Sequence, residues 1–301
     1  MAAIDGEEIA KTYRAQLRDQ VKELAGKGIT PTLAPILVGE DPGARVYFRT
    51  KRRLAKDLGL NFAGVEMETE ASQAKVISKI EELSQDSDIH GLFLELPLPE
   101  HLDHEKLAYH IDPRKDIDCV NPTNLGKLIG AGIANRPFTE VRDDFSYMFP
   151  ATPSAIMHIL DTLPVDLEGK QMVLLGGGSV GLPLSILLLG ETRSSVTVCK
   201  SRTGDVTAQS KRADVLCVAV GIKDFVSADM VKEGAIVVDV GINETDSGIT
   251  GDVKYQEVKN KASHITPVPG GVGPVTTTMI MKNTIQTARQ LELTSNVTST
   301  Q

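Results

Sequence analysis

The sequence predicts an α/β protein with two domains, and three observations lead to this fold class. Short apolar runs alternate with longer amphipathic runs along most of the 301 residues, as in parallel strands connected by helices. The runs in the second half are apolar throughout, which suits strands of a parallel sheet that is covered on both faces. The chain is also long enough for two hydrophobic cores.

The first half of the chain contains three predicted helices and three predicted strands. The apolar residues of the first helix recur every three to four positions, and Gly26 and Gly59 end the first two helices. The helices are expected at 6–26, 44–58 and 71–85, and the strands at 32–39, 62–67 and 89–99. The last strand holds Glu95 among apolar residues, and a buried carboxylate is costly unless a partner compensates it.

The second half shows the same alternation more strongly. Strands are predicted at 171–177, 194–201, 213–221 and 234–242, and helices at 181–190 and 275–292. The segment 130–153 contains polar residues and prolines, so we expect the junction between the two domains there.

The composition argues against several functional classes. The chain has a formal net charge of −8 and a pI of about 5.3, which gives no indication of a nucleic-acid partner or of an anionic membrane surface. Cys119, Cys199 and Cys217 lack the close spacing of a metal site, so we expect reduced thiols and no metal. The apolar runs fall short of about 18 residues and the N-terminus is polar, so a cytoplasmic protein without a membrane span is expected.

A glycine-rich loop follows the predicted strand at 171–177. Gly176, Gly178 and Gly181 form the pattern G-x-G-x-x-G after an apolar strand and at the start of a helix, which is typical of a dinucleotide-binding turn. The glycines let the backbone approach a pyrophosphate, whose charge the helix N-terminus favours. Gly177 and Ser179 lie within this loop and join the expected cofactor contacts, while a plain tight turn is the alternative.

The residues after the next strand indicate which dinucleotide binds. An NAD site normally has Asp or Glu about 20 residues after the glycines, whereas this chain has Lys200, Ser201 and Arg202 there. Two cations and a hydroxyl attract the 2′-phosphate of NADP, so NADP is favoured over NAD, unless these cations only solvate a strand end. Gly221 and Ile242, which end the next two predicted strands, complete the expected cofactor-binding set.

Tyr47 and Lys51 are four residues apart on the predicted helix at 44–58 and therefore lie on one face of it. The pair can place a phenol beside an amine in a site. Exposed helices also carry Tyr and Lys at this spacing, so the spacing alone leaves both interpretations open.

At these residues the chain resembles the bifunctional methylenetetrahydrofolate dehydrogenase/methenyltetrahydrofolate cyclohydrolase family over nearly its whole length. The resemblance rests on stretches that occur in order, "VYFRTK", "HGLFLELPLP", "PRKDIDCVNPTNLGKL", "PATPSAI", "GAIVVDVGIN", "GDV" and "ITPVPGGVGPVT". It implies an N-terminal α/β catalytic domain (1–148 plus 280–301), a C-terminal Rossmann-type parallel-sheet domain (149–279), a cleft between them, and a homodimer.

The resemblance also implies two reactions. Methylenetetrahydrofolate is oxidised to a methenyl cation with NADP, and water then opens the ring to give formyltetrahydrofolate. Lys51 is implied as the general acid/base, with Tyr47 packing on the pterin and orienting Lys51, and Asp118 as the group that binds the pterin's amino group and ring nitrogen. The other implied folate contacts are Pro269, Gly270, Gly271, Val272 and Gly273.

The chemistry of the residues fits this assignment. A carboxylate suits the edge of a 2-amino-4-oxo pyrimidine, which presents two donors side by side. A lysine held partly out of water can lose its proton and activate water near neutral pH. From the residues alone, Asp116 or Asp118 can instead be a helix cap or a turn residue.

Glu95 departs from the family, which usually has Gln at this position, bonded to the catalytic lysine. Glu95 is therefore expected to face Lys51 and is a further catalytic candidate. A carboxylate can hold Lys51 as an ammonium and so impair the cyclohydrolase, because two unit charges about 4 Å apart attract by roughly 4 kcal/mol at an effective dielectric near 20. Glu95 can also serve as the base itself, or form a tolerated ion pair that leaves both activities intact.

Two further departures concern the binding sites. The loop "GGGSVGLP" is one residue shorter than the family pattern G-R-S-x-x-V-G-x-P and has Gly177 at the Arg position, which weakens the family-based argument for NADP. Cys119 stands where the family often has Gly. A single-activity paralogue and a catalytically silent folate- and dinucleotide-binding protein are the alternatives to a bifunctional enzyme, and ligand-dependent turnover separates them.

Overall fold

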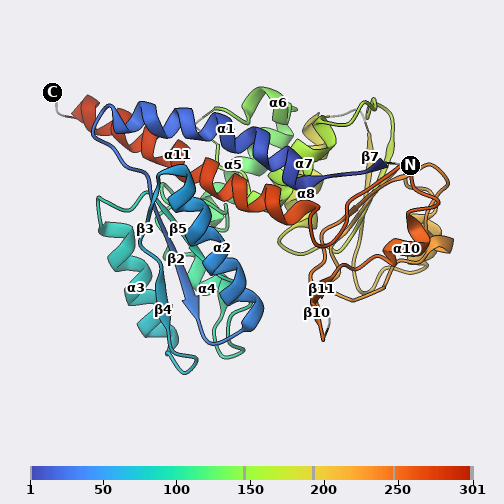
Figure 1. The fold of residues 1–301 in the computed structure, drawn as a ribbon, viewed down its shortest axis with the longest axis horizontal. Helices are drawn as coiled ribbons and strands as arrows, with labels where there is room; N and C mark the ends of the chain where they lie inside the picture. Colours follow the sequence, from blue (N-terminus) through green and yellow to red (C-terminus); the bar gives the residue numbers. More distant parts are fainter. Residues whose placement is uncertain (1, 145–146, 192–193, 247, 299–301) are drawn as a thin grey trace. The chain divides into compact units, whose positions relative to one another are not determined.

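The computed structural model describes residues 2–144, 147–191, 194–246 and 248–298 (Figure 1). The chain divides into two compact units, each of which contains one parallel sheet. The four-stranded unit contains the described residues of Thr12–Lys127, Phe145–Ala151 and Thr277–Gln301. The six-stranded unit contains those of Met1–Lys11, Leu128–Asp144 and Thr152–Thr276.

The sheet of the four-stranded unit is built around one central strand. Its strands are β2 (Thr32–Val38), β3 (Asn61–Phe62), β4 (Val65–Met67) and β5 (Gly91–Leu94). β5 pairs with β2 along Leu33–Ile36, so β3 and β4 share the opposite edge of β2. The strand predicted at 62–67 is thus divided in two, because the chain passes the rings of Phe48 and Phe62 at Gly64, where a Cβ would lie 2.4 Å from a ring carbon of Phe62.

Helices cover both faces of this sheet (Figure 1). Leu37 of β2 packs against Phe48 of α2 on one face, and Ile36 packs with Ile80 of α3 on the other, as the alternation of a strand requires. α2 begins at Pro42 because the Asp41 side chain accepts the Ala44 N–H, and it ends at Gly59 with a φ of 86°. The helices formed wholly or partly by this unit are α1 (Gly6–Ala25), α2 (Pro42–Leu58), α3 (Gln73–Gln85), α4 (His104–Ala108), α5 (Pro122–Ile133) and α11 (Val272–Thr298).

The six-stranded sheet is parallel throughout and has the order β1-β12-β9-β8-β6-β7. Its strands are β1 (Ala2–Ala3), β6 (Gln171–Leu175), β7 (Ser195–Cys199), β8 (Val215–Val218), β9 (Ile236–Asp239) and β12 (His264–Ile265). The strand that follows β6 in the sequence lies on one side of it and the next lies on the other. This change of direction is a topological switch point, where α/β proteins bind ligands outside the carboxyl ends of the strands.

The interior strands β8 and β9 are buried on both faces, which explains why their residues are apolar except for Asp239 at the end of β9. Shorter elements complete the unit. They are α6 (Phe138–Val141), α7 (Ala151–Asp161), α8 (Gly181–Glu191), α9 (Val206–Ser210), the 3₁₀ helix η1 (Ala228–Met230), α10 (Tyr255–Val258) and the hairpin of β10 (Asn243–Thr245) and β11 (Gly248–Thr250). None of the helices in the described ranges is long and apolar enough to cross a membrane.

The structure also differs from the sequence-based elements at Glu95, in the predicted junction and at the N-terminus. The strand predicted at 89–99 is reduced to Gly91–Leu94, because Pro97 and Pro99 have no N–H for a ladder, so Glu95 follows the strand rather than lying within it. The predicted junction at 130–153 contains α6, whose N-cap is Pro137. Residues 2–3 form an edge strand of the six-stranded sheet, whereas the sequence-based boundaries assign them to the first domain; the functional domain boundaries stay a prediction.

Candidate functional site

Lys51 lies on the buried face of α2, and only 6% of its surface is exposed. The other buried residues of this helix recur at the same helical spacing and are all apolar, namely Ala44, Phe48, Leu54, Ala55 and Leu58. Lysine is rarely buried unless it is paired. A lysine in the apolar stripe of a helix is therefore a sequence signal for a functional amine, and it is more specific than the spacing from Tyr47.

Glu95 is the partner of Lys51. The Lys51 Nζ donates to both carboxylate oxygens, at 2.9 Å to Oε1 and 2.7 Å to Oε2. Glu95 directly follows β5, only 3% of it is exposed, and its backbone N–H donates to the Ile36 carbonyl at 2.9 Å. Burial raises the pKa of Glu95, and the charge and hydrogen bond of Lys51 act in the opposite direction. The pair explains how the fold tolerates a carboxylate at this position.

Two aromatic rings flank the Lys51 amine. Its Nζ lies 5.1 Å from the ring centroid of Phe93 and 5.6 Å from that of Tyr47, both within the range of cation–π attraction. Tyr47 is half-buried, and burial raises its pKa, so its phenol stays neutral at physiological pH. The amine is therefore enclosed by one carboxylate and two apolar ring faces.

Asp118 lies at the end of a segment that runs parallel to β5, through a bridge between Leu92 and Asp116. Glu95 and Asp118 thus follow neighbouring parallel segments at the same edge of the sheet. The Asp118 Oδ1 accepts the Ala151 N–H at 3.2 Å, at the first residue of α7. Asp118 therefore does contact a helix N-terminus, as the cap interpretation expects, and the same carboxylate is half-buried beside the Lys51–Glu95 pair.

The protonation state of Asp118 depends on its burial and on the charged groups around it. Burial raises its pKa to about 6, and the Ala151 N–H opposes the rise. The negative charges of Asp116 and Glu95 add to the rise, and the charge of Lys51 opposes it. The Asp118 carboxyl is thus poised to change charge just below neutral pH.

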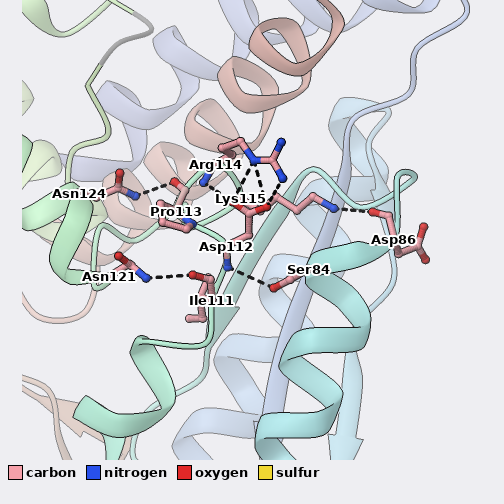
Figure 2. Close-up of polar contacts among 9 residues, drawn as sticks. All are labelled: Ser84, Asp86, Ile111, Asp112, Pro113, Arg114, Lys115, Asn121 and Asn124. Carbon is pink, nitrogen blue, oxygen red and sulfur yellow. Dashed lines mark hydrogen bonds and ion pairs between the residues drawn. The ribbon is translucent and has the colours of Figure 1, made fainter. Parts of the chain in front are cut away.

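The segment that leads to Asp118 is held by side chains on both sides of it (Figure 2). The Asn121 Nδ2 donates to the Ile111 carbonyl at 3.0 Å, and the Asn124 Nδ2 donates to the Pro113 carbonyl at 2.8 Å. Ser84 of α3 accepts the N–H of Asp112 through its hydroxyl at 3.2 Å. These bonds fix the backbone of residues 111–113 between α3 and α5.

Lys115 and Asp116 complete this anchoring. The buried Lys115 Nζ donates to the Asp86 carbonyl at the C-terminus of α3, 2.5 Å away (Figure 2). Asp116 is fully buried and accepts the backbone N–H groups of Val120 and Asn121 at 3.2 Å and 2.9 Å. Asp116 is therefore a turn residue that positions its neighbour Asp118, which is one of the alternatives that the sequence left open.

Cys119 follows Asp118 with a φ of 54°, in the left-handed region that favours glycine. This backbone conformation explains why glycine is common at this position in the family that the chain resembles. Cys119 is buried, and burial raises the pKa of its thiol well above the ordinary value. A protonated, buried thiol is a packing group rather than a nucleophile.

The glycine loop after β6 has the steric features of a dinucleotide-binding turn. A Cβ on Gly181 would lie 1.8 Å from the Gly176 carbonyl oxygen, and a Cβ on Gly176 would lie 2.1 Å from the Ala219 carbonyl oxygen. Gly181 therefore lets the start of α8 lie against the end of β6. Gly176 lets the end of β6 lie against the end of β8. Gly178 has open space around its Cβ position, as required where a phosphate approaches the backbone.

A pocket of about 570 Å³ lies at the carboxyl ends of β6, β7 and β8, at the switch point of the sheet. Its lining combines the glycine loop, a cation and apolar side chains, and consists of Leu175–Gly178, Cys199–Ser201, Val206, Ala219, Val220, Ile222 and Phe225. The open glycines suit a phosphate and the apolar walls suit a flat ring, so the residues present fit a dinucleotide.

The structure places the other predicted cofactor residues around this pocket or outside it. The Lys200 stem lies over Gly177, since a Cβ on Gly177 would meet it at 2.5 Å. Arg202 and Ser179 are exposed, and neither lines the pocket in the described part of the chain. Gly221 and Ile242 do not line it either; the Gly221 N–H is bonded to Asp252, and Ile242 is 45% exposed.

Sequence reasoning missed the buried acids Asp239 and Asp252, although both lie in quoted stretches. Asp252 accepts backbone N–H groups of the pocket wall, and Asp239 accepts the backbone N–H groups of Asp252 and Val253, both at 3.0 Å. The sequence offered no specific signal for either acid: Asp239 ends an apolar run in "VVDVG", two residues before Gly241, and Asp252 follows Gly251 in "GDV".

The predicted folate loop lies at the start of α11 in the six-stranded unit. Gly270 has a φ of 102°, and its carbonyl accepts the Gly6 N–H at 2.9 Å. Gly271 and Val272 are buried, Gly273 is half-buried and Pro269 is exposed. The folate contacts of this loop stay a prediction.

Two family matches cover most of the chain. Residues 4–118 match the family described as "Tetrahydrofolate dehydrogenase/cyclohydrolase, catalytic domain". Residues 150–292 match the family described as "Tetrahydrofolate dehydrogenase/cyclohydrolase, NAD(P)-binding domain".

Individual relatives are similar along nearly their whole length. The bifunctional protein FolD of Bacillus licheniformis is 42% identical over 289 residues, which are 95% of this chain and 97% of that protein. The solved structure of the bifunctional enzyme FolD from Campylobacter jejuni matches with a TM-score of 0.88 and 35% identity, covering 96% of this chain and 99% of that one. FolD from Trypanosoma brucei, complexed with NADP cofactor and inhibitor, matches with a TM-score of 0.86 and 31% identity, covering 96% and 97%.

Proposed function

The chain belongs to the tetrahydrofolate dehydrogenase/cyclohydrolase family, and from this membership we propose how its residues carry the two activities. It is a bifunctional methylenetetrahydrofolate dehydrogenase and methenyltetrahydrofolate cyclohydrolase of one-carbon metabolism. The observation that carries the proposed division of roles is the buried contact between Lys51 and Glu95, with Asp118 beside it.

The dehydrogenase step depends on holding a dinucleotide at the pocket after β6. NADP, when bound there, accepts the hydride that leaves the methylene carbon of the folate. Gly178 gives the backbone access that a pyrophosphate needs, and the N-terminus of α8 favours its charge. No proton transfer at Lys51 is required for this step.

The cyclohydrolase step needs a base that takes a proton from water. Water forms a bond to the methenyl carbon while the Lys51 amine takes one of its protons. The same group returns a proton to the ring nitrogen as the carbon–nitrogen bond breaks, and the remaining hydroxyl proton leaves as the formyl carbonyl forms. Lys51 therefore acts first as a base and then as an acid.

Glu95 makes Lys51 available for this role. Burial disfavours both charges of the pair, and it raises the pKa of Glu95. The Glu95 Oε2 lies 2.7 Å from the Lys51 Nζ, close enough to take a proton from the ammonium directly and leave a neutral amine. We therefore favour a proton-sharing pair over a lysine locked as an ammonium.

Asp118 is proposed to bind the pterin. Its carboxylate accepts the amino group and the ring N–H side by side, and Tyr47 packs on the ring. Asp118 must be ionised for this contact. The loop Pro269–Gly273 is proposed to supply further folate contacts.

The pH dependence of folate binding tests this role. Because burial raises the pKa of Asp118 to about 6, we expect the KM for methylenetetrahydrofolate to rise as the pH falls through that value. The carboxylate, present above pH 6, is the binding form. The measurement is the dehydrogenase KM between pH 5 and 8, and Asp118→Asn should remove the dependence. A KM that is flat over this range in the unmodified enzyme would refute the role.

We further propose NADP as the preferred dinucleotide, because Lys200 lines the pocket. NADP is also the cofactor in the Trypanosoma brucei complex. Lys200→Ala should lower the NADP-over-NAD ratio of kcat/KM by about 10–100-fold, since the contact of an ammonium with a phosphate is charge-assisted. Arg202→Ala, outside the pocket lining, is the matched control and should change the ratio less. An equal loss in both variants, or none, would contradict the assignment.

The two alternatives that differ in activity are separated by one coupled assay. Purified protein is given methylenetetrahydrofolate with NADP or NAD, and reduced cofactor and methenyl absorbance are followed together. Turnover of both substrates supports the bifunctional enzyme. Hydride transfer without hydrolysis favours a single-activity paralogue, and no turnover favours a binding protein.

A homodimer and a cytoplasmic location are proposed from family analogy. Light scattering of the purified protein tests the first, and fractionation of the source cells tests the second.

A further inference from the structure

We propose that Asp252 is a positioning residue for dinucleotide binding, because its carboxylate holds the backbone that forms one wall of the pocket. The inference rests on the proposed use of that pocket by NADP. It adds a residue that acts through the backbone N–H groups of Val220 and Gly221.

The Asp252 carboxylate is fully buried, and both of its oxygens accept hydrogen bonds. Its Oδ2 accepts the N–H groups of Val220 at 2.7 Å and of Gly221 at 2.9 Å, and its Oδ1 accepts the Asn243 Nδ2 at 2.8 Å. Two backbone donors thus converge on one oxygen, and a side-chain donor takes the other. An ionised carboxylate, which accepts on both oxygens, is the group that satisfies all three.

The backbone that Asp252 holds is the pocket wall after β8. Ala219, Val220 and Ile222 line the pocket, and Gly221 lies between them with a φ of 67°. Val220 packs against the hydrophobic core of the unit, whereas Ile222 is 54% exposed. The bonds from Val220 and Gly221 to Asp252 therefore fix the backbone where the wall leaves the core and becomes exposed.

Asp252 is itself fixed by a second acid. The Asp252 and Val253 N–H groups donate to Asp239, and a Cβ on Gly251 would lie 1.9 Å from the Asp239 Oδ2. In the same way, a Cβ on Gly241 would lie 2.0 Å from the Asp252 Cγ. Each carboxylate occupies the space beside a glycine on the other acid's segment, so the ends of β8 and β9 are joined rigidly.

A preformed wall lowers the ordering cost of binding, so its loss should appear in cofactor affinity rather than in the chemical step. Asp252→Ala removes the acceptor of the Val220 and Gly221 N–H groups. Asp252→Asn keeps an acceptor oxygen for them, and its N–H₂ can donate to Asn243 when the Asn243 amide turns its oxygen toward it. For Asp252→Ala we expect the KM for NADP to rise about tenfold or more, with the dehydrogenase kcat within about threefold, and for Asp252→Asn we expect a smaller rise.

The control is Asp214→Asn in the same unit. Asp214 also accepts a backbone N–H, from Gln171 at 2.8 Å, and a side-chain donor, Lys232 at 2.6 Å, but it lies at the amino end of β8. This variant should lose stability without a change in the KM for NADP. The double variant Asp252→Asn with Asn243→Asp lets the amide donate to a carboxylate and accept both backbone donors, so it should recover most of the affinity.

The measurements are the KM and kcat for NADP, the cyclohydrolase rate, which uses no cofactor, and the NADP Kd by calorimetry. A raised NADP Kd with an unchanged cyclohydrolase rate, restored by the double variant, supports the proposal. An unchanged Kd in folded Asp252→Ala overturns it, as does a parallel loss of both activities in Asp252→Ala with no recovery in the double variant. Calorimetry needs no turnover, so the test of Asp252 stands apart from a failure of the proposed catalytic function.

Discussion

Lys51→Ala should lower the cyclohydrolase kcat by about 10²–10⁴-fold, the usual contribution of a general base. The dehydrogenase kcat should stay within about tenfold, because hydride transfer needs no proton removal at Lys51. The expectation rests on the amine's place between Glu95 and the rings of Tyr47 and Phe93. Single-turnover rates of both reactions, measured on one preparation, give the comparison.

Two companion variants make the Lys51 result specific. Lys51→Ala leaves Glu95 buried without its cation, which typically costs about 3–5 kcal/mol of stability. Lys51→Gln is therefore measured beside it, because the amide keeps a hydrogen-bond donor for Glu95 and the protein stays folded. Glu95→Gln removes the carboxylate that takes the Lys51 proton, so the cyclohydrolase kcat should fall while the dehydrogenase kcat stays within about threefold. Equal loss of both activities in Lys51→Gln, or an unchanged or increased cyclohydrolase kcat in Glu95→Gln, would contradict the proton-sharing pair.

Gly181→Ala should unfold or severely weaken the six-stranded unit and abolish NADP binding. Its Cβ would stand 1.8 Å from the Gly176 carbonyl oxygen, and that atom belongs to the backbone and cannot rotate away. Relieving the clash requires α8 to move off the end of β6, and overpacking of this kind costs typically about 1–3 kcal/mol and occasionally more. Denaturant unfolding with and without NADP measures the effect.

Gly178→Ala is the matched control for this glycine. No atom lies within 4 Å of its Cβ position, so the variant should keep its stability to within about 1 kcal/mol. Its KM for NADP should still rise, because the new methyl group stands where the pyrophosphate approaches the backbone. If Gly181→Ala bound NADP tightly, or Gly178→Ala unfolded, the assigned roles of the glycines would be wrong.

The sequence predicted the fold class well because the interior strands of the six-stranded sheet are buried on both faces. β8 and the first three residues of β9 are apolar for this reason, and an apolar run of that kind is a clear signal. β1 and β12 have two residues each and gave no such signal. Their pairing depends on a register between distant segments, which no local pattern encodes.

The residues of the candidate site were predictable to different degrees. Lys51 and Glu95 each break an apolar pattern, and the structure brings them into contact. Lys200 follows a strand at a fixed distance from the glycines, whereas Arg202, two residues further, lies outside the pocket lining among the described residues. Asp252 could not be predicted, because its partners Val220 and Gly221 are backbone donors that any sequence supplies.

The glycines beside Asp239 and Asp252 show a further property of the six-stranded unit. Gly251 leaves the volume that the Asp239 carboxylate fills, and Gly241 leaves the volume that the Asp252 carboxylate fills. Each glycine lacks a side chain at the place where the carboxylate from the other segment packs. The packing after β9 and β11 therefore depends on two acid–glycine pairs, and a substitution of either member of a pair also changes the environment of the other.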